Sequence, residues 1–469
     1  MRTHNVASSA CLSVLLIAAA ERSPLALAQP IDPGVRAAPA DGKPPQPLPG
    51  VTADEREYFQ DGLARFMTIE VVSGAGTGEG NGLGPRFNSN QCSSCHLQPV
   101  VGGSSPASNP LIGVASAGGA SNSVPWFIAP NGPIREARFV QSNGVTDGGV
   151  HDLFVISGRA DAPGCSIAQP NFLPAGNPLT GQGGNPNVVF RIPTPIMGAG
   201  LIESIPDSTI IANMNANAAQ KAQLGIGGHV NSVQGGTVNR SANDGTITRF
   251  GWKAQNKSLL MFSGEAYNVE MGISNQLFPQ ERDETPSCQL ASAAPNDTSN
   301  FSAGPATGVL SDVEAFADFM RLLAPPTPAP PTADTRFGQA VFTSVGCAFC
   351  HTPSLTTGTR IASGSSTSPS AALSHQQANL YSDLLVHHMG TALADGITQG
   401  AAGPDEFRTA PLWGVGQREY FLHDGRASNL VQAIEAHASQ GSEATATVQH
   451  FNSLPPQSQQ ALIDFLRSL

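Results

Sequence analysis

The chain has 469 residues, enough for two or three domains that each bury an apolar core. Only 13% of the residues are charged, and the 50 Gly and 38 Pro indicate a globular but loop-rich protein. The net charge of −11 argues against nucleic-acid binding, because a surface of this sign repels phosphate.

The N-terminus predicts a secretory signal peptide over residues 1–28. Arg2 supplies a positive charge, residues 10–20 form a short apolar run, and Ala-Leu-Ala at 26–28 offers a small-residue cleavage site. The apolar run is too short to span a bilayer, and no later segment is long enough, so no stable membrane insertion is expected. We therefore expect a protein exported to the periplasm.

Two Cys-x-x-Cys-His motifs dominate the remaining sequence: Cys92, Cys95 and His96, and Cys347, Cys350 and His351. In such a motif the two thiols bond covalently to haem, and the adjacent His binds the iron. A zinc site would not explain a His directly after both pairs, and a thioredoxin-like motif would need βαβ surroundings. The sequence therefore predicts two covalently attached c-type haems with their iron.

Cys165 and Cys288 are the two cysteines left over once the signal peptide is removed and both haems are attached. Because export leads to an oxidising compartment, the sequence predicts a disulfide between them. The alternative is two separate buried thiols.

Proline-rich stretches divide the chain. Residues 29–50 predict a flexible or extended leader rather than a packed element, and residues 324–333 predict a semi-rigid linker. The linker separates an N-terminal haem domain, 51–323, from a C-terminal haem domain, 334–469.

The two domains end alike, with Asp-Phe-Met-Arg-Leu-Leu at 318–323 and Asp-Phe-Leu-Arg-Ser-Leu at 464–469. Both endings complete amphipathic segments, 311–323 and 456–469, that predict helices. Phe87 and Phe342 each lie five residues ahead of the first motif cysteine and suggest a further equivalence.

The expected fold is mainly α with long loops and minor β, built from two cytochrome c-like haem domains. The first domain is enlarged by loop-rich insertions, chiefly 102–243, with short strands such as 187–192 and 246–250.

Several stretches resemble the family of dihaem oxidoreductases known as peroxidases or thiol oxidoreductases, which is related to dihaem cytochrome c peroxidases. They are Gly-Leu-Gly-Pro-Arg-Phe-Asn at 82–88 before the first motif, and segments 157–165, 249–254, 270–275, 407–413 and 421–426. The resemblance covers most of residues 52–469.

The resemblance implies that one haem is six-coordinate and takes in electrons, while the other keeps an open site for peroxide. In the relatives the sixth ligand comes from the helix after a His-Asp-Gly turn. This favours His437, on a predicted helix over 430–438, as a ligand of the second haem, with Met389 as the alternative. His423, in the turn itself, is expected near a haem propionate.

The first domain has only His151 and His229 beyond its motif, and neither has the spacing of the relatives' displaceable His, so we expect an open first haem. Glu203, alone among apolar residues, is a candidate base whose pKa burial would raise; the alternative is a surface Glu. Arg159 is a candidate for stabilising developing charge, or a structural ion pair. Trp252 is a candidate electron relay between the haems, or a core aromatic.

The expected function is reduction of hydrogen peroxide, or another small oxidant, with electrons from a small donor protein of the cytochrome or cupredoxin type. The alternatives are a dihaem electron-transfer cytochrome without catalysis and a dihaem oxygenase of an organic substrate. Calcium is a further candidate ligand that no motif establishes.

Overall fold

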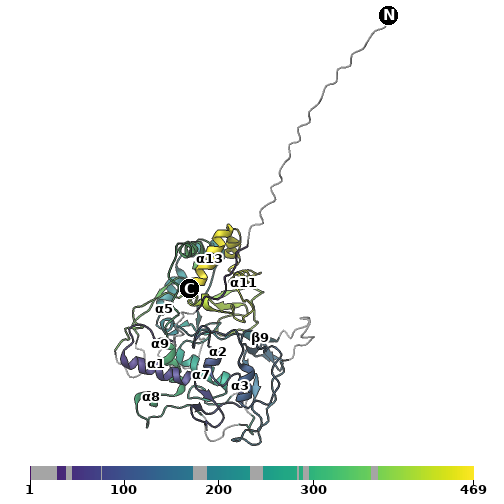
Figure 1. Ribbon diagram of the computed structural model, residues 1–469, viewed down its shortest axis with the longest axis vertical. Coiled ribbons are helices and arrows are strands. Elements are labelled where there is room, and N and C mark those ends of the chain that lie inside the picture. Colours follow the sequence, from purple (N-terminus) through teal and green to yellow (C-terminus); the bar gives the residue numbers. More distant parts are fainter. Residues whose placement is uncertain are drawn as a thin grey trace.

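The computed structural model describes residues 1, 29–37, 45–74, 76–172, 187–232, 247–281, 285–288, 295–360 and 368–469. The predicted signal peptide lies outside these residues, apart from Met1. Helices predominate, and the strands are short and pair in sheets of two or three, which confirms a mostly helical fold with minor β. Figure 1 shows α1, α7 and α9 in one part of the molecule and α11 and α13 in another.

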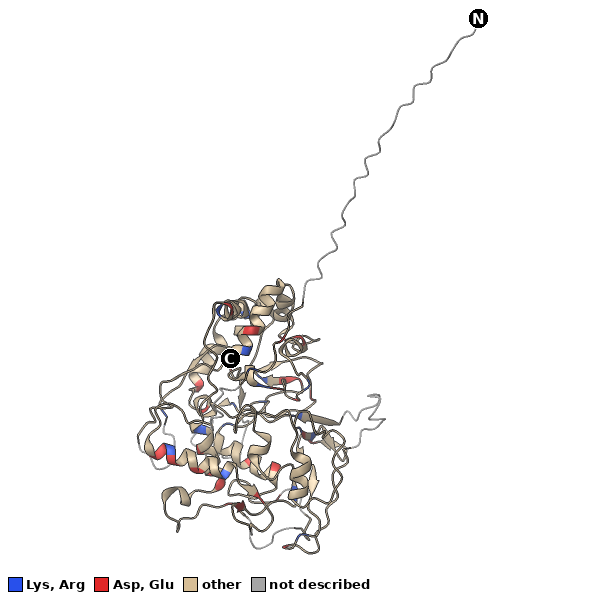
Figure 2. Cartoon of the chain, viewed as in Figure 1, with Lys and Arg blue, Asp and Glu red and all other residues tan. Residues whose placement is uncertain are grey.

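The first part is built on two packed helices, α1 (Ala53–Phe66) and α9 (Asp312–Leu322). Both begin with a capping box, Thr52 with Glu55 and Ser311 with Glu314, which satisfies the free N–H groups of the first turn. The helices approach closely at Gly62, where a Cβ atom would lie 2.2 Å from a backbone oxygen of α9. Acidic and basic side chains alternate on α1 (Figure 2).

The second part repeats this packing with α10 (Ala333–Ser344) and α13 (Pro456–Ser468). Gly338 of α10 touches α13 so closely that a Cβ atom would lie 1.9 Å from the Ala461 oxygen. The helices predicted over 311–323 and 456–469 are therefore confirmed as α9 and α13.

The structural equivalent of Phe342 is Phe66, and the proposed equivalence with Phe87 is wrong. Phe66 and Phe342 each lie four residues after the close-contact glycine of their helix. Their rings lie 5.1 Å from Phe319 and 5.5 Å from Phe465, respectively. Phe87 instead lies in β3 (Arg86–Phe87), because a segment with β1 (Ile69–Glu70) and β2 (Glu79–Gly80) separates α1 from the first motif.

The enlarged region 102–243 contains the predicted strand 187–192 as β9 (Val188–Arg191), which joins β4 (Glu136–Phe139) and β7 (Val150–His151) in a sheet of order β7-β4-β9. Strand 246–250 appears as β11 (Ile247–Thr248), paired with β10 (Asn231–Ser232). Smaller strands are β5 (Gln141–Ser142), β6 (Val145–Thr146) and β8 (Phe154–Val155).

The region is less purely loop than predicted, because it also holds α3 (Leu111–Ala117), α4 (Ala199–Glu203), α5 (Asp207–Asn215) and α6 (Ala218–Leu224). None of these four helices has a side-chain N-cap hydrogen bond, so the usual start signal was missing from the sequence.

Further elements complete the fold. In the first part these are α2 (Cys92–Cys95), α7 (Leu259–Met271) and α8 (Ala306–Val309). In the second part they are η1 (Cys347–Phe349), β12 (Leu355–Thr356), β13 (Gln377–Ala378), β14 (Val386–His388), β15 (Glu406–Arg408), η2 (Val415–Gln417), α11 (Leu430–Ala436) and α12 (Thr445–Asn452).

The described part of the leader forms no helix, and it packs against the rest of the chain, whereas the sequence predicted an unpacked segment. Asp32 forms an ion pair with Arg467 of α13 at 2.6 Å, and Leu48 is buried. Within the linker, the Ala329 N–H donates to the Ser468 carbonyl oxygen. Backbone hydrogen bonds also cross between the two predicted domains, as from Gly358 to Ser204, so the domain boundary at 324–333 stays a prediction.

Cys165 and Cys288 are buried and form the predicted disulfide, with their Cα atoms 4.5 Å apart. Within the described ranges, no helix combines the length and the apolar character needed to cross a membrane.

Candidate functional site

The second motif opens onto a large, mostly apolar cavity of about 1460 Å³ of unfilled space. Cys347, Cys350 and His351 follow directly after α10, so the helix pair α10–α13 fixes their position. Apolar side chains from α11, α12 and α13 form much of the wall: Leu430, Ala433, Phe451, Leu462 and Leu466.

His351 is held in the form that a metal ligand requires. Its Nδ1 donates to the Tyr381 carbonyl oxygen at 3.0 Å, which leaves Nε2 without a hydrogen bond among the described residues. Burial lowers the pKa of His351 to about 4, so the imidazole is neutral at pH 7. Fixing one ring nitrogen by a carbonyl is the usual way in which a protein orients a ligating His.

His437 lines the same cavity and has the same arrangement. It is the C-cap of α11, so the predicted helix over 430–438 is confirmed with its end two residues earlier. Its Nδ1 donates to the Ala433 carbonyl oxygen at 2.6 Å, and burial lowers its pKa. The structure thus brings His351 and His437 together around one cavity, which Met389 also lines.

Of the other histidines of the second part, His387 and His423 also line the second cavity, whereas His375 and His388 are exposed. His387 is bonded through Nδ1 to Glu443 and through Nε2 to Asp383. His388 is exposed and bonded to Asp405, and His375 is exposed. His423 is buried, lines the second cavity and stacks on Phe407 with ring centroids 4.2 Å apart.

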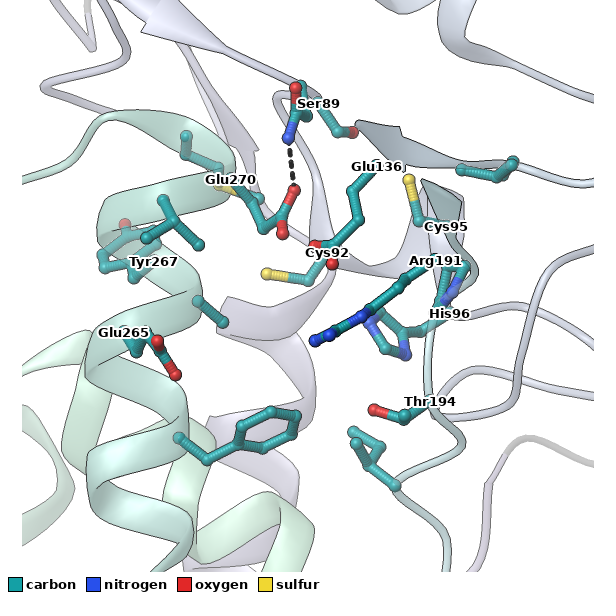
Figure 3. A pocket seen from close by; sticks show the side chains of 18 of the residues that line it. Ser89, Cys92, Cys95, His96, Glu136, Arg191, Thr194, Glu265, Tyr267 and Glu270 are labelled. Atoms are coloured by element: carbon teal, nitrogen blue, oxygen red, sulfur yellow. Dashed lines mark hydrogen bonds between the residues drawn. The ribbon is translucent and has the colours of Figure 1, made fainter. Parts of the chain in front are cut away.

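The first motif lies in α2 and opens onto a second cavity, with about 1200 Å³ of unfilled space. His96 Nδ1 donates to the Gly103 carbonyl oxygen at 3.2 Å, and burial lowers the pKa of His96 to about 4. This neutral imidazole is therefore prepared as a ligand in the same way as His351. Figure 3 shows Cys95 and His96 on one side of the cavity and Glu265 and Glu270, both from α7, on the other.

The rest of the first cavity differs from the second, because none of its described lining residues is a second His. His151 and His229 lie outside it and are bonded to Asp147 and Glu406. The expectation that neither serves the first haem agrees with this placement. Two thioethers, of Met271 and Met320, do line the cavity.

Glu136 and Glu270 form a half-buried carboxyl pair on the first cavity that the sequence analysis missed. They share a side-chain hydrogen bond. Burial and the Glu136 charge raise the pKa of Glu270 well above its usual range. Burial acts to raise the pKa of Glu136 too, but the charges of Arg138, 2.6 Å away, and Arg191 together with hydrogen bonds from Glu270 and Arg138 outweigh it and hold that pKa low. The pair therefore holds one proton on Glu270 near neutral pH.

Glu270 could have been noticed from the sequence, since it begins the family-like segment 270–275. Glu136 had no such signal, because only the β4–β9 pairing places it beside α7.

Glu203 is buried, but the structure does not place it on either haem cavity. Its carboxylate pairs with Arg321 at 2.9 Å and with Arg360 at 2.5 Å. The raised pKa expected on burial is wrong: burial acts to raise it, but the two guanidinium charges outweigh burial and lower it. A carboxylate held in this way is a poor base, and its position is that of a structural ion pair.

Arg159 lies apart from both cavities and forms a bidentate pair with Asp161 at 2.7 and 3.0 Å. It also donates to the Cys288 carbonyl oxygen, beside the disulfide. The structure therefore gives Arg159 the structural surroundings that the sequence analysis named as the alternative to a catalytic role.

Trp252 is the one proposed catalytic residue that meets both cavities. Its indole N–H donates to the Ile192 carbonyl oxygen at 2.9 Å, which fixes the ring. The ring centroid lies 6.4 Å from that of His423, in an edge contact.

A family model described as "Di-haem oxidoreductase, putative peroxidase" matches residues 185–469. The chain belongs to this family. No curated protein matches it. Among solved structures, a MauG-like protein associated with microbial copper homeostasis is 13% identical over 65% of this chain and 95% of its own, with a TM-score of 0.26. Hydrazine synthase of Kuenenia stuttgartiensis is 20% identical over 35% of this chain, with a TM-score of 0.22, and the match spans 56% of its length. These two similarities are too low to carry an argument.

Membership of the dihaem oxidoreductase family implies haem cofactors, and the residues of both cavities fit haem. Each cavity offers two cysteine thiols that are not in a disulfide, a neutral imidazole with its Nδ1 already bonded, and a mainly apolar lining. Two thiols and one His in each cavity match the donor set of a c-type haem.

A calcium site finds less support. The one compact group of possible metal ligands among the described residues is Cys350, Asp383 and His387, in which only Asp383 offers oxygen. Calcium prefers oxygen ligands, so this group does not suit it.

Proposed function

We propose that the chain is an exported dihaem c-type cytochrome that reduces hydrogen peroxide with electrons from a small donor protein of the cytochrome or cupredoxin type. The observation that carries the proposal is the unequal content of the two cavities. The second cavity is lined by histidines besides His351, and one of them, His437, has its Nδ1 fixed by a carbonyl oxygen in the same way. No described lining residue of the first cavity is a His other than His96, which faces a carboxyl pair.

In the second cavity, His351 and His437 would both bind the haem iron. Haem supplies one-electron chemistry at its iron, and two strong ligands suit electron transfer rather than substrate binding. Both imidazoles are fixed through Nδ1 and are neutral, so a change of iron charge need not move a proton on either ring.

In the first cavity, Cys92 and Cys95 would tether haem, and His96 would bind its iron. Reduction of peroxide requires a proton to leave one oxygen and reach the other. Glu270 holds the proton of the pair and Glu136 is its hydrogen-bond partner, so Glu270 can donate a proton to the departing oxygen and take one back afterwards. Apolar neighbours such as Ile134, Leu153 and Phe262 limit the access of water.

Trp252 supports an electron route between the cavities, since its ring lines both of them. An aromatic ring held by a hydrogen bond keeps a fixed position, which a relay requires.

The test combines spectroscopy with one matched pair of variants. The oxidised protein should show one high-spin and one low-spin haem in electron paramagnetic resonance. Glu270→Gln should lower kcat for peroxide about 100-fold or more, as expected for loss of a general acid–base group. Glu265→Gln is the control, because Glu265 lines the same cavity but is bonded to Asn256. Equal activity of both variants would contradict the assignment.

A dihaem electron-transfer cytochrome is the second candidate, favoured by the two thioethers on the first cavity. If Met271 or Met320 bound the first iron, both haems would be six-coordinate and low-spin. A wild-type spectrum without a high-spin component in any redox state, together with no peroxide turnover, would select this function.

Export is tested separately, by the N-terminus of the protein recovered from the periplasm. Cleavage after Ala28 should leave Gln29 first. Recovery of the uncleaved chain from the cytoplasm would contradict this part of the proposal.

A further inference from the structure

Two arginines of the second part, Arg408 and Arg418, lie along the second cavity. Arg408 ends β15 and is 9% exposed, and Arg418 directly follows η2. Both also line a smaller pocket that includes Trp252 and Trp413. This pocket shares Trp252 with both large cavities, so the two guanidinium groups lie where the haem sites approach each other.

Neither arginine has an acidic partner among the residues that the structure describes. Arg408 donates from Nε to the Gly251 carbonyl oxygen at 3.0 Å, and Arg418 donates from Nη2 to the Pro411 carbonyl oxygen at 3.0 Å. Arg408 Nη1 is buried without a hydrogen-bond partner in the described residues.

The two charges also oppose each other. Burial lowers the pKa of each arginine to about 10, and the Arg418 charge contributes to the lowering at Arg408. Both groups remain charged at neutral pH. Other buried arginines of this protein have acidic partners, as Arg191 has Asp395 at 2.7 Å and Arg321 has Glu203 at 2.9 Å. Arg408 is buried and Arg418 is half-buried. Two like charges that are removed from water in this way are unfavourable without an anion, so an anion is expected to bind between them.

We propose that Arg408 and Arg418 bind the two propionate carboxylates of the second haem. The inference rests on the proposed function in one respect, that haem occupies the second cavity. Haem brings two carboxylates, and the cavity offers two guanidinium groups without acidic partners. The planar guanidinium fork suits a carboxylate better than any other cation of a protein does.

Besides balancing charge, these ion pairs would link the second haem to Trp252. The Arg408 backbone N–H donates to the Trp252 carbonyl oxygen at 2.8 Å. The residue that binds a propionate is therefore joined to the residue that lines both haem cavities. Arg408 and Arg418 would act as positioning residues for the second haem and would keep its propionates ionised at neutral pH.

The experiment uses the holoprotein and the variants Arg408→Gln, Arg418→Gln and both together. Haem content is measured first, and then the propionate bending modes in resonance Raman spectra and the midpoint potential of the low-spin haem against pH. The propionate modes should shift. The midpoint potential should fall, because a positive charge near the haem is lost. It should also become dependent on pH between about pH 5 and 7, since removal of the cation raises the pKa of a buried propionate. The high-spin haem should not change.

Arg426→Gln is the matched control, because Arg426 belongs to the same part of the chain but is exposed and paired with Asp424. It should leave the propionate modes and the pH profile unchanged. If the Gln variants fail to retain haem, Arg408→Lys and Arg418→Lys decide: they keep the charge and lose the planar fork, so the modes must still shift.

Unchanged propionate modes in variants that retain both haems would overturn the assignment. So would a saturable change of the wild-type low-spin spectrum with acetate at constant ionic strength, because the pocket would then bind a solute anion. Absence of haem from the wild type would instead refute the proposed function, so the two failures are distinguishable.

Discussion

The two haem cavities have the same foundation and different contents. In each part a helix with a close-contact glycine packs on the last helix, and a Phe of the first helix lies near the motif histidine, Phe66 at 6.1 Å from His96 and Phe342 at 6.3 Å from His351. Each motif histidine donates from Nδ1 to a carbonyl oxygen. The shared scaffold therefore positions the motif histidine and cysteines in the same way in both cavities.

The difference comes from the second helix that packs on the last helix of each part. In the second part α11 packs on α13 and brings His437 to the cavity, whereas in the first part α7 packs on α9 and brings Glu270. One helix thus supplies a second imidazole and its counterpart supplies an acid. Two copies of one scaffold can in this way hold one six-coordinate and one reactive haem.

Substitution of the motif cysteines should have the largest effect, because it should remove one of the two haems. The variants Cys92→Ala with Cys95→Ala, and Cys347→Ala with Cys350→Ala, should each lower haem content from two to one per chain, because each pair tethers its own haem. The pyridine haemochrome spectrum of denatured protein measures this content. A variant that keeps two covalent haems would contradict the assignment of that motif.

His437→Ala should alter the second haem alone. Loss of an imidazole ligand should convert the low-spin signal to high-spin and shift the second potential, while the first haem keeps its spectrum. His388→Ala is the control, since the His388 side chain is 53% exposed. If His437→Ala retains the low-spin signal, Met389 becomes the ligand to test.

The disulfide belongs only to the first part, so its loss should separate the stabilities of the two parts. Cys165→Ala with Cys288→Ala should lower the free energy of unfolding by about 2–4 kcal/mol, because the bond closes a long loop of the unfolded chain. Urea unfolding followed at each haem measures the difference, with reduced wild type for comparison. Two alkylatable thiols in native, unreduced protein would refute the bond itself.

The close-contact glycines test whether the shared scaffold is equally tight in both parts. Gly62→Ala and Gly338→Ala should each destabilise by about 1–3 kcal/mol, since the new methyl group would meet the backbone of the partner helix. Gly113→Ala is the control on α3, where nothing lies within 4 Å of the added carbon. That substitution should be neutral or slightly stabilising. Similar values for all three glycines would contradict the tight packing.

The sequence predicted the disulfide and the helices α9 and α13, because these depend on local spacing or on a small number of cysteines. Its prediction of the haem-attachment residues awaits the haem-content measurement. It gave no reliable guide to the first cavity. Glu203 stood alone among apolar residues, yet Arg321 and Arg360 come from more than a hundred residues away to neutralise it. Glu136 and Glu270 are likewise distant in sequence, and only the folded chain brings both of them to the first cavity.

The match between the two parts of the chain also could not be predicted from sequence spacing alone. Spacing from the cysteines selected Phe87, whereas helix packing selects Phe66, because the first part carries an inserted segment between α1 and its motif. Equivalence in such a repeat follows helix contacts more closely than distance from a motif.

The inserted segment, which has no counterpart in the second part, contains Glu70. The ionisation of this residue should make stability depend on pH, and this is the smallest of the predicted effects. Glu70 is 2% exposed, and burial together with the charge of Asp312 raises its pKa to about 8. The folded state therefore holds its proton more tightly than the unfolded state, whose Glu titrates near its usual value of about 4.3. Stability from this group is full at low pH and falls as pH rises toward 8.

Glu70→Gln removes the ionisable group and should therefore remove the loss of stability at higher pH. Relative to wild type, the variant should gain about 1 kcal/mol or more in free energy of unfolding at pH 8 compared with pH 5, since one pKa unit corresponds to about 1.4 kcal/mol. Urea unfolding at the two pH values measures the gain. Glu57→Gln, at an exposed site on α1, controls for the loss of one negative charge. A gain that is equal for both variants, or larger at pH 5, would show that Glu70 is not held protonated by the fold.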